Sequence, residues 1–60
     1  MTLWVFERFG TGAVLVVAAD AVGKAKTLAE SVSPGVWAAI TELDGVYEGR
    51  VGVLYNTEGN

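Results

Sequence analysis

The sequence contains no cysteine and no histidine. Disulfide bridges are therefore excluded, and the usual zinc sites are excluded too, because cysteine and histidine are their main ligands. Catalysis by a thiolate or by a histidine-activated serine is also excluded. We therefore expect a protein that is not an enzyme, with no metal site, no cofactor and no catalytic residues.

Charged residues are scarce. They make up 18% of the chain, and only four of them are lysine or arginine, so the formal net charge is −3. The basic residues lie far apart in the sequence, at Arg8, Lys24, Lys26 and Arg50. A phosphate backbone is normally bound by a stripe of positive charge, and none is visible here. Nucleic acid is therefore not the partner that this composition favours.

The chain also lacks a long hydrophobic run. Its longest uninterrupted apolar segment covers residues 13–19, whereas a membrane-spanning helix needs about 20 apolar residues. Glu7 and Arg8 interrupt the first apolar segment, which has no basic region before it, so no signal peptide is predicted. These features predict a cytoplasmic protein without a membrane segment.

What the chain does contain is a high hydrophobic fraction, 52%, in only 60 residues. This length predicts one small domain spanning residues 1–60. A chain of this size buries only about 60% of its unfolded surface, so its own core provides little stability. Disulfides and zinc are excluded, which leaves association with another subunit as the means to bury more apolar surface.

A helix is predicted over residues 20–33, including its stop signal. Asp20 is placed to cap the helix N-terminus, because its carboxylate can accept the amide hydrogens of the first turn. Apolar residues at helical spacing then form one face of the helix: Ala21, Ala25, Leu28, Ala29 and Val32. Ser33-Pro34-Gly35 ends the helix, because proline disfavours helical geometry at the residue before it.

Residues 1–19 read as a first β-hairpin. Two apolar segments, residues 2–9 and 13–19, flank Gly10-Thr11-Gly12, which suits a three-residue hairpin loop. With that loop, one face of the hairpin carries Trp4, Phe6, Val14 and Val16, and the other carries Leu3, Val5, Leu15 and Val17. The hairpin is thus apolar on both faces.

Residues 36–55 read as a second hairpin, with Asp44-Gly45 as a type I′ turn between strands 36–43 and 46–55. Its core face would carry Val36, Ala38 and Ile40, and its opposite face Trp37, Ala39 and Arg50. Residues 56–60 are predicted to fray. The whole pattern predicts an α+β fold of order ββαββ, a four-stranded mixed sheet with one helix packed on one face.

One helix covers one face of such a sheet, so the other face is left exposed. Monomers rarely expose large apolar patches, and sheet-on-sheet packing in a homodimer would cover this one. We predict that the interface is formed by five residues: Leu15, Val17, Trp37, Ala39 and Arg50. Trp37 and Arg50 are of the types that dominate binding hot spots.

The predicted function is a protein-interaction module, a homodimer that acts as a regulator or inhibitor of a larger complex, with a phage-type inhibitor as one form of it. Asp44 and Glu48 form a secondary acidic surface for a basic partner. One alternative is a small-ligand or nucleotide-binding module, with a pocket at the helix N-terminus or across a dimer seam. The other alternative is a single-stranded nucleic-acid binder that stacks bases on four sheet aromatics, Trp4, Trp37, Tyr47 and Tyr55.

Overall fold

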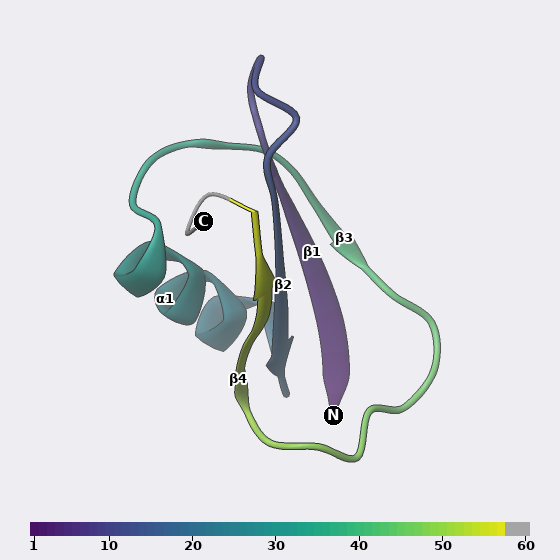
Figure 1. Ribbon diagram of the computed structural model, residues 1–60. Coiled ribbons are helices and arrows are strands. Elements are labelled where there is room, and N and C mark those ends of the chain that lie inside the picture. Colours follow the sequence, from purple (N-terminus) through teal and green to yellow (C-terminus); the bar gives the residue numbers. More distant parts are fainter. Residues whose placement is uncertain (58–60) are drawn as a thin grey trace.

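The computed structural model describes residues 1–57 and shows one helix on one side of a four-stranded sheet (Figure 1). The elements follow the predicted order ββαββ, so the α+β fold class is confirmed. Their bounds are β1 Thr2–Arg8, β2 Val14–Ala19, α1 Val22–Val32, β3 Trp37–Glu42 and β4 Gly52–Asn56.

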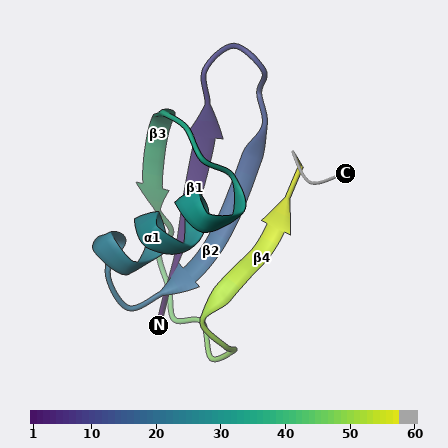
Figure 2. The ribbon, with the colours of Figure 1, turned by 90° about the vertical axis from the view of Figure 1, so that its left-hand side faces the viewer.

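The strands lie in the order β3-β1-β2-β4, and each neighbouring pair is antiparallel. β1 and β2 form the predicted first hairpin at the centre of the sheet, with β3 and β4 as the two edges (Figure 2). The prediction of a mixed sheet is wrong. β2 and β3 run in the same direction, but β1 lies between them, so they are not paired.

The predicted second hairpin is also wrong, because β3 and β4 lie at opposite edges of the sheet. Residues 43–51 connect them, and Figure 1 shows this connection passing the N-terminal end of β1 on the side of the sheet away from α1. Two backbone hydrogen bonds attach it there: Leu43 N–H donates to Leu3 O (2.9 Å), and Tyr47 N–H donates to Met1 O (2.8 Å). The Asp44-Gly45 turn therefore bends a long connection.

The register of the central hairpin differs by one residue from the prediction. Arg8 N–H donates to Ala13 O (3.1 Å), and Phe6 lies opposite Leu15 instead of Val16. Because side chains alternate between the two faces of a strand, a slip of one residue moves every side chain of β2 to the other face. Leu15 and Val17 therefore lie on the same face as Phe6.

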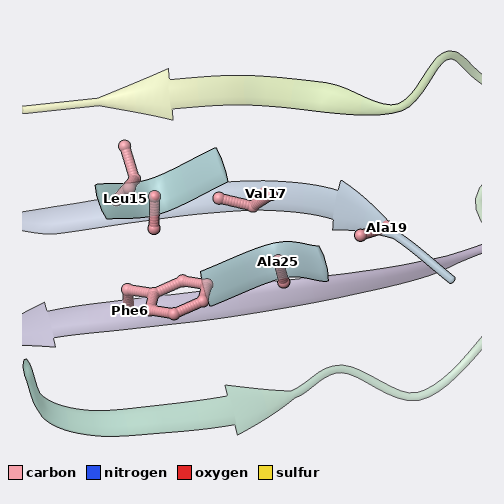
Figure 3. Close-up of a cluster of buried hydrophobic side chains, with 6 residues drawn as sticks. Phe6, Leu15, Val17, Ala19 and Ala25 are labelled. Atoms are coloured by element: carbon pink, nitrogen blue, oxygen red, sulfur yellow. The ribbon is translucent and has the colours of Figure 1, made fainter. Parts of the chain in front are cut away.

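The core lies between this face and α1. Phe6, Leu15 and Val17 are the largest fully buried side chains, and they lie beneath Ala25 of the helix (Figure 3). Ala29 of the helix belongs to the same core cluster. The small alanine side chains allow the helix backbone to lie close to the sheet. The predicted helix face is confirmed for Ala25, Leu28 and Ala29, whereas Ala21 and Val32 are exposed.

The N-terminus of α1 differs from the prediction. The N-cap is Ala21, in extended conformation, and no side chain forms a capping hydrogen bond, so the proposed Asp20 cap is wrong. At the other end the helix stops at Val32, as Ser33-Pro34-Gly35 predicts, and Ser33 N–H donates to Ala29 O (2.8 Å).

The guanidinium of Arg8 binds the chain that follows the helix. It donates to the Ser33 carbonyl, to Ser33 Oγ (2.8 Å), to Pro34 O (2.8 Å) and to Val36 O (3.1 Å). It also lies 3.6 Å over the centre of the Trp37 ring. A side chain of β1 thus provides hydrogen-bond donors to carbonyl groups at the helix end, which need partners outside the helix.

The predicted fraying of the tail is wrong for its first two residues. Asn56 belongs to β4 and pairs with Leu15. Thr57 N–H donates to Val14 O (3.0 Å), and Thr57 Oγ1 accepts from Val14 N–H (2.8 Å). Residues 58–60 lie outside the described residues.

Candidate interaction face

The face of the sheet away from α1, called the open face below, carries alternate residues of all four strands. One row runs across it through the pairs Thr41–Val5, Val5–Val16 and Val16–Tyr55. Strand alternation adds the neighbours of this row on each side. The open face comprises Leu3, Val5, Glu7, Val14, Val16, Ala18, Ala39, Thr41 and Tyr55. Only Glu7, Thr41 and the Tyr55 hydroxyl are polar.

Within residues 1–57, no helix or strand packs across the open face, because α1 covers the other side and all four strands belong to this one sheet. Val5, Val14 and Val16 are half-buried, Ala18 is fully buried, and Tyr55 is 57% exposed. An apolar surface of this kind is typical of an interaction site.

The structure moves three of the five predicted interface residues away from the open face. Leu15 and Val17 are fully buried in the core beneath the helix. Trp37 packs against the same core, with its ring edge-to-face on Phe6 (centroids 5.1 Å apart), and it is half-buried. The prediction that these three side chains face away from α1 is wrong.

The other two predicted interface residues are separated from each other. Ala39 lies on the open face and is exposed, as predicted. Arg50 is also exposed, but it lies in the connection between β3 and β4. Leu3 and Val5 were assigned correctly to the face opposite the helix, and Val14, Val16 and Tyr55 were missed. A hairpin loop one residue longer than Gly10-Thr11-Gly12 would have placed Val14 and Val16 on the face opposite the helix.

A hollow of about 160 Å³ lies at one end of the open face. The hollow is lined by Leu3 of β1 and by five residues of the connection that follows β3: Leu43, Asp44, Gly45, Val46 and Tyr47. Most of these side chains are apolar, and the one charged group among them is the Asp44 carboxylate. A carboxylate repels the phosphates of a nucleotide, so this hollow does not suit the nucleotide-binding alternative.

The predicted acidic surface lies on the same connection. Asp44 and Glu48 are both exposed. Among residues 1–57 no three acidic, histidine or cysteine side chains come close enough together to hold a metal ion. Contacts with a basic partner stay a prediction for these two carboxylates.

The four aromatic residues considered for base stacking do not share a surface. Trp4 and Trp37 pack against the helix-covered core, and the Trp4 indole N–H donates to Ala19 O (3.1 Å). Tyr47 lines the hollow, and Tyr55 lies on the open face. Single-stranded nucleic acids are bound by exposed aromatics that stack successive bases beside positive charge. This arrangement gives no such platform.

Within the part of the chain that the structure describes, no helix is long and apolar enough to cross a membrane. Comparison with known proteins gives no relative: the chain matches no protein-family model, no curated protein and no solved structure.

Proposed function

We propose that the protein is a small interaction module that forms a homodimer through its open face and acts on a larger complex as a regulator or inhibitor. The observation that carries this proposal is the row of Val5, Val16 and Tyr55, which extends across a sheet face that α1 does not cover. Two open faces packed together would bury these side chains against each other.

The small size of the core supports association. Among residues 1–57 three large side chains are fully buried, and the other buried hydrophobic residues are alanines: Ala18, Ala19, Ala25 and Ala29. An alanine contributes little apolar area, so the fully buried part of the core is small, and the larger side chains packed against it are only partly buried: Trp4, Leu28, Trp37, Ile40 and Val53. A second copy is a partner of matching shape and chemistry that is always present.

Both edges of the sheet are poorly suited to pairing with another strand. The β1–β3 register shifts between Glu7 and Arg8, and the β2–β4 register shifts between Val16 and Val17. Such bulges kink an edge strand, and they are a common protection against edge-to-edge pairing. This favours association through the face of the sheet over extension of the sheet from its edge.

The open face is smaller than a standard protein–protein interface. Four strands about 4.8 Å apart, each with about six residues at 3.3 Å per residue, cover a patch of roughly 19 by 20 Å. A standard interface buries about 800 Å² per partner, which is about a fifth of the 3756 Å² accessible surface of this chain. The patch covers roughly 380 Å² per copy, about half of that standard area, so we expect a weak, reversible dimer.

Such a dimer leaves other surfaces free to bind a larger complex. Asp44, Glu48 and Arg50 lie exposed on the connection between β3 and β4. On the outer side of α1, Lys24 and Lys26 are exposed. Charged residues at these positions can select a partner of complementary charge without being buried in the dimer.

Sedimentation equilibrium over about 1 µM to 1 mM tests the proposal, because interfaces at the low end of the size range bind weakly. We expect a monomer–dimer equilibrium for the natural sequence and a monomer for Val16→Lys, which buries one unpaired charge from each copy. Val32→Lys is the matched control: it makes the same change at an exposed position on α1. A natural sequence that stays monomeric throughout, or two lysine variants that dimerise equally well, would overturn the proposal.

A further inference from the structure

Two apolar features are exposed at opposite ends of β1. Phe9 follows β1 at the tip of the first hairpin, and it is 65% exposed. The hollow at the start of β1 has a volume of about 160 Å³ and is lined by Leu3, Leu43 and Val46 among others. An exposed aromatic ring and an exposed apolar hollow are both unfavourable in water.

The hollow lies on the side of the open face, and Phe9 lies in the hairpin turn just beyond the other end of β1. Leu3, Val5 and Glu7 alternate along β1 on this face, and Phe9 follows the last residue of β1 and is exposed in the turn of the hairpin. The hollow combines Leu3 with the connection of residues 43–51, which passes the sheet on the side away from α1 (Figure 1). At about 3.3 Å per residue, the six steps from Leu3 to Phe9 span roughly 20 Å.

A two-fold axis lying between two packed open faces, and running across the strands, reverses the strand direction in the facing copy. If the axis passes near the Val5–Val16 pair, midway along β1, the hairpin tip of each copy lies over the hollow of the other. We infer that Phe9 of each copy inserts into the hollow of its partner, so that two identical contacts flank the central valine row. This inference rests on the proposed homodimer.

The sizes of ring and hollow agree. A cavity of about 150 Å³ lined by apolar side chains accommodates benzene, and the hollow measures about 160 Å³. The Asp44 carboxylate belongs to an exposed residue of the lining, so it can stay hydrated while the ring contacts the apolar side chains. The contact also defines the relative orientation of the two sheets, which a flat valine surface alone leaves open.

Because the chain contains no cysteine, disulfide cross-linking tests this contact cleanly. In one chain Phe9 and Val46 lie at opposite ends of the sheet, too far apart for a bridge, which needs Cα atoms within about 7 Å. The double variant Phe9→Cys, Val46→Cys is therefore expected to form a covalent dimer on oxidation, whereas each single variant is not. The two-fold axis keeps the two copies of Phe9 roughly 20 Å apart, and the two copies of Val46 similarly separated.

The matched control is the double variant Phe9→Cys, Val22→Cys. Val22 is 40% exposed and begins α1, at the same end of the sheet as the hollow but on the helix side. It should give no covalent dimer. If the Phe9→Cys, Val22→Cys variant forms as much covalent dimer as the Phe9→Cys, Val46→Cys variant, the inference is overturned. Such a result would mean that the cysteine at the hairpin tip reacts by random collision.

A second measurement separates the inference from the proposed dimer. Phe9→Ala should raise the dimer Kd by roughly a hundredfold, because the symmetry removes two buried aromatic contacts at once. If Val16→Lys abolishes the dimer while Phe9→Ala leaves its Kd within about threefold of the natural value, the dimer stands and the Phe9 contact is refuted. If the natural sequence is monomeric, the proposed dimer fails and the contact fails with it.

Discussion

Replacing Arg8 should destabilise the protein more than any other change to a charged residue. Its guanidinium donates to carbonyl groups of Ser33, Pro34 and Val36, and it stacks on Trp37. These contacts attach the end of α1 and the start of β3 to the central strand β1. They connect segments that are 25 to 28 residues apart in the sequence.

The magnitude follows from what Arg8→Ala leaves behind. Ser33 is 9% exposed, so little water can replace the donors that Arg8 provides to its carbonyl and hydroxyl, and their loss costs about 1–3 kcal/mol. The lost stacking on Trp37 adds about 0.5–1 kcal/mol at a partly exposed site. The total of about 3 kcal/mol is a large part of the roughly 3–9 kcal/mol expected for a chain of 60 residues, and it lowers Tm by about 12–24 °C.

The assay is urea unfolding followed by tryptophan fluorescence, at one fixed protein concentration because association adds stability. Arg8→Lys is the matched control: it keeps the positive charge but lacks the planar fork that donates in several directions and stacks on a ring. We expect it to lose at least half as much free energy of unfolding as Arg8→Ala. An alanine variant within about 0.5 kcal/mol of the natural sequence, at an unchanged m-value, would refute this reasoning.

Three further predictions concern the backbone, the core and the helix N-terminus. Gly35→Ala should lower the free energy of unfolding by roughly 2–3 kcal/mol, because φ at Gly35 is +133° and the new Cβ would lie 2.8 Å from Nη1 of Arg8. Gly12→Ala is the control: φ is +71° with open space around it, so urea unfolding should show a loss of about 1 kcal/mol. Val17→Ala should cost about 2–3 kcal/mol and Val16→Ala less than about 1 kcal/mol at concentrations where the protein is monomeric; the reverse order would mean that the assigned faces are exchanged. Asp20→Ala should change Tm by less than about 3 °C, because no capping hydrogen bond is lost. A measured loss of about 1 kcal/mol in the free energy of unfolding would show that Asp20 caps the helix after all.

The helix and the first hairpin could be predicted because their signals are local. Apolar residues at helical spacing place Ala25 and Ala29 on the buried face, and Ser33-Pro34-Gly35 gives the stop that the structure shows. The helix N-terminus was harder to predict. Asp20 has the right chemistry for a cap, yet the structure begins the helix one residue later than such a cap requires, with Ala21 as the N-cap.

The second hairpin could not be predicted from its turn signal. Asp44-Gly45 is a strong local signal, but it competes with pairing between segments far apart in the sequence. β1 and β2 are apolar on both faces and occupy the centre of the sheet, where each takes a further partner on its outer side. Pairing β3 with β4 would have left one of these central strands at an edge. The apolar character of residues 2–9 and 13–19 was therefore the better guide to strand order.

The first hairpin explains why an open apolar face could be predicted, although the residues that form it could not. A loop of three residues pairs Phe6 with Val16, and the observed pairing of Phe6 with Leu15 needs one residue more. That single residue exchanges the two faces of β2, and turn glycines alone do not determine it. The existence of an open apolar face survives the exchange, because Val14 and Val16 are as apolar as Leu15 and Val17. That an interface exists can thus be predicted from composition, whereas its residues depend on the strand register. Comparing Val16→Lys with Val32→Lys tests this choice of residues, which the sequence alone does not determine.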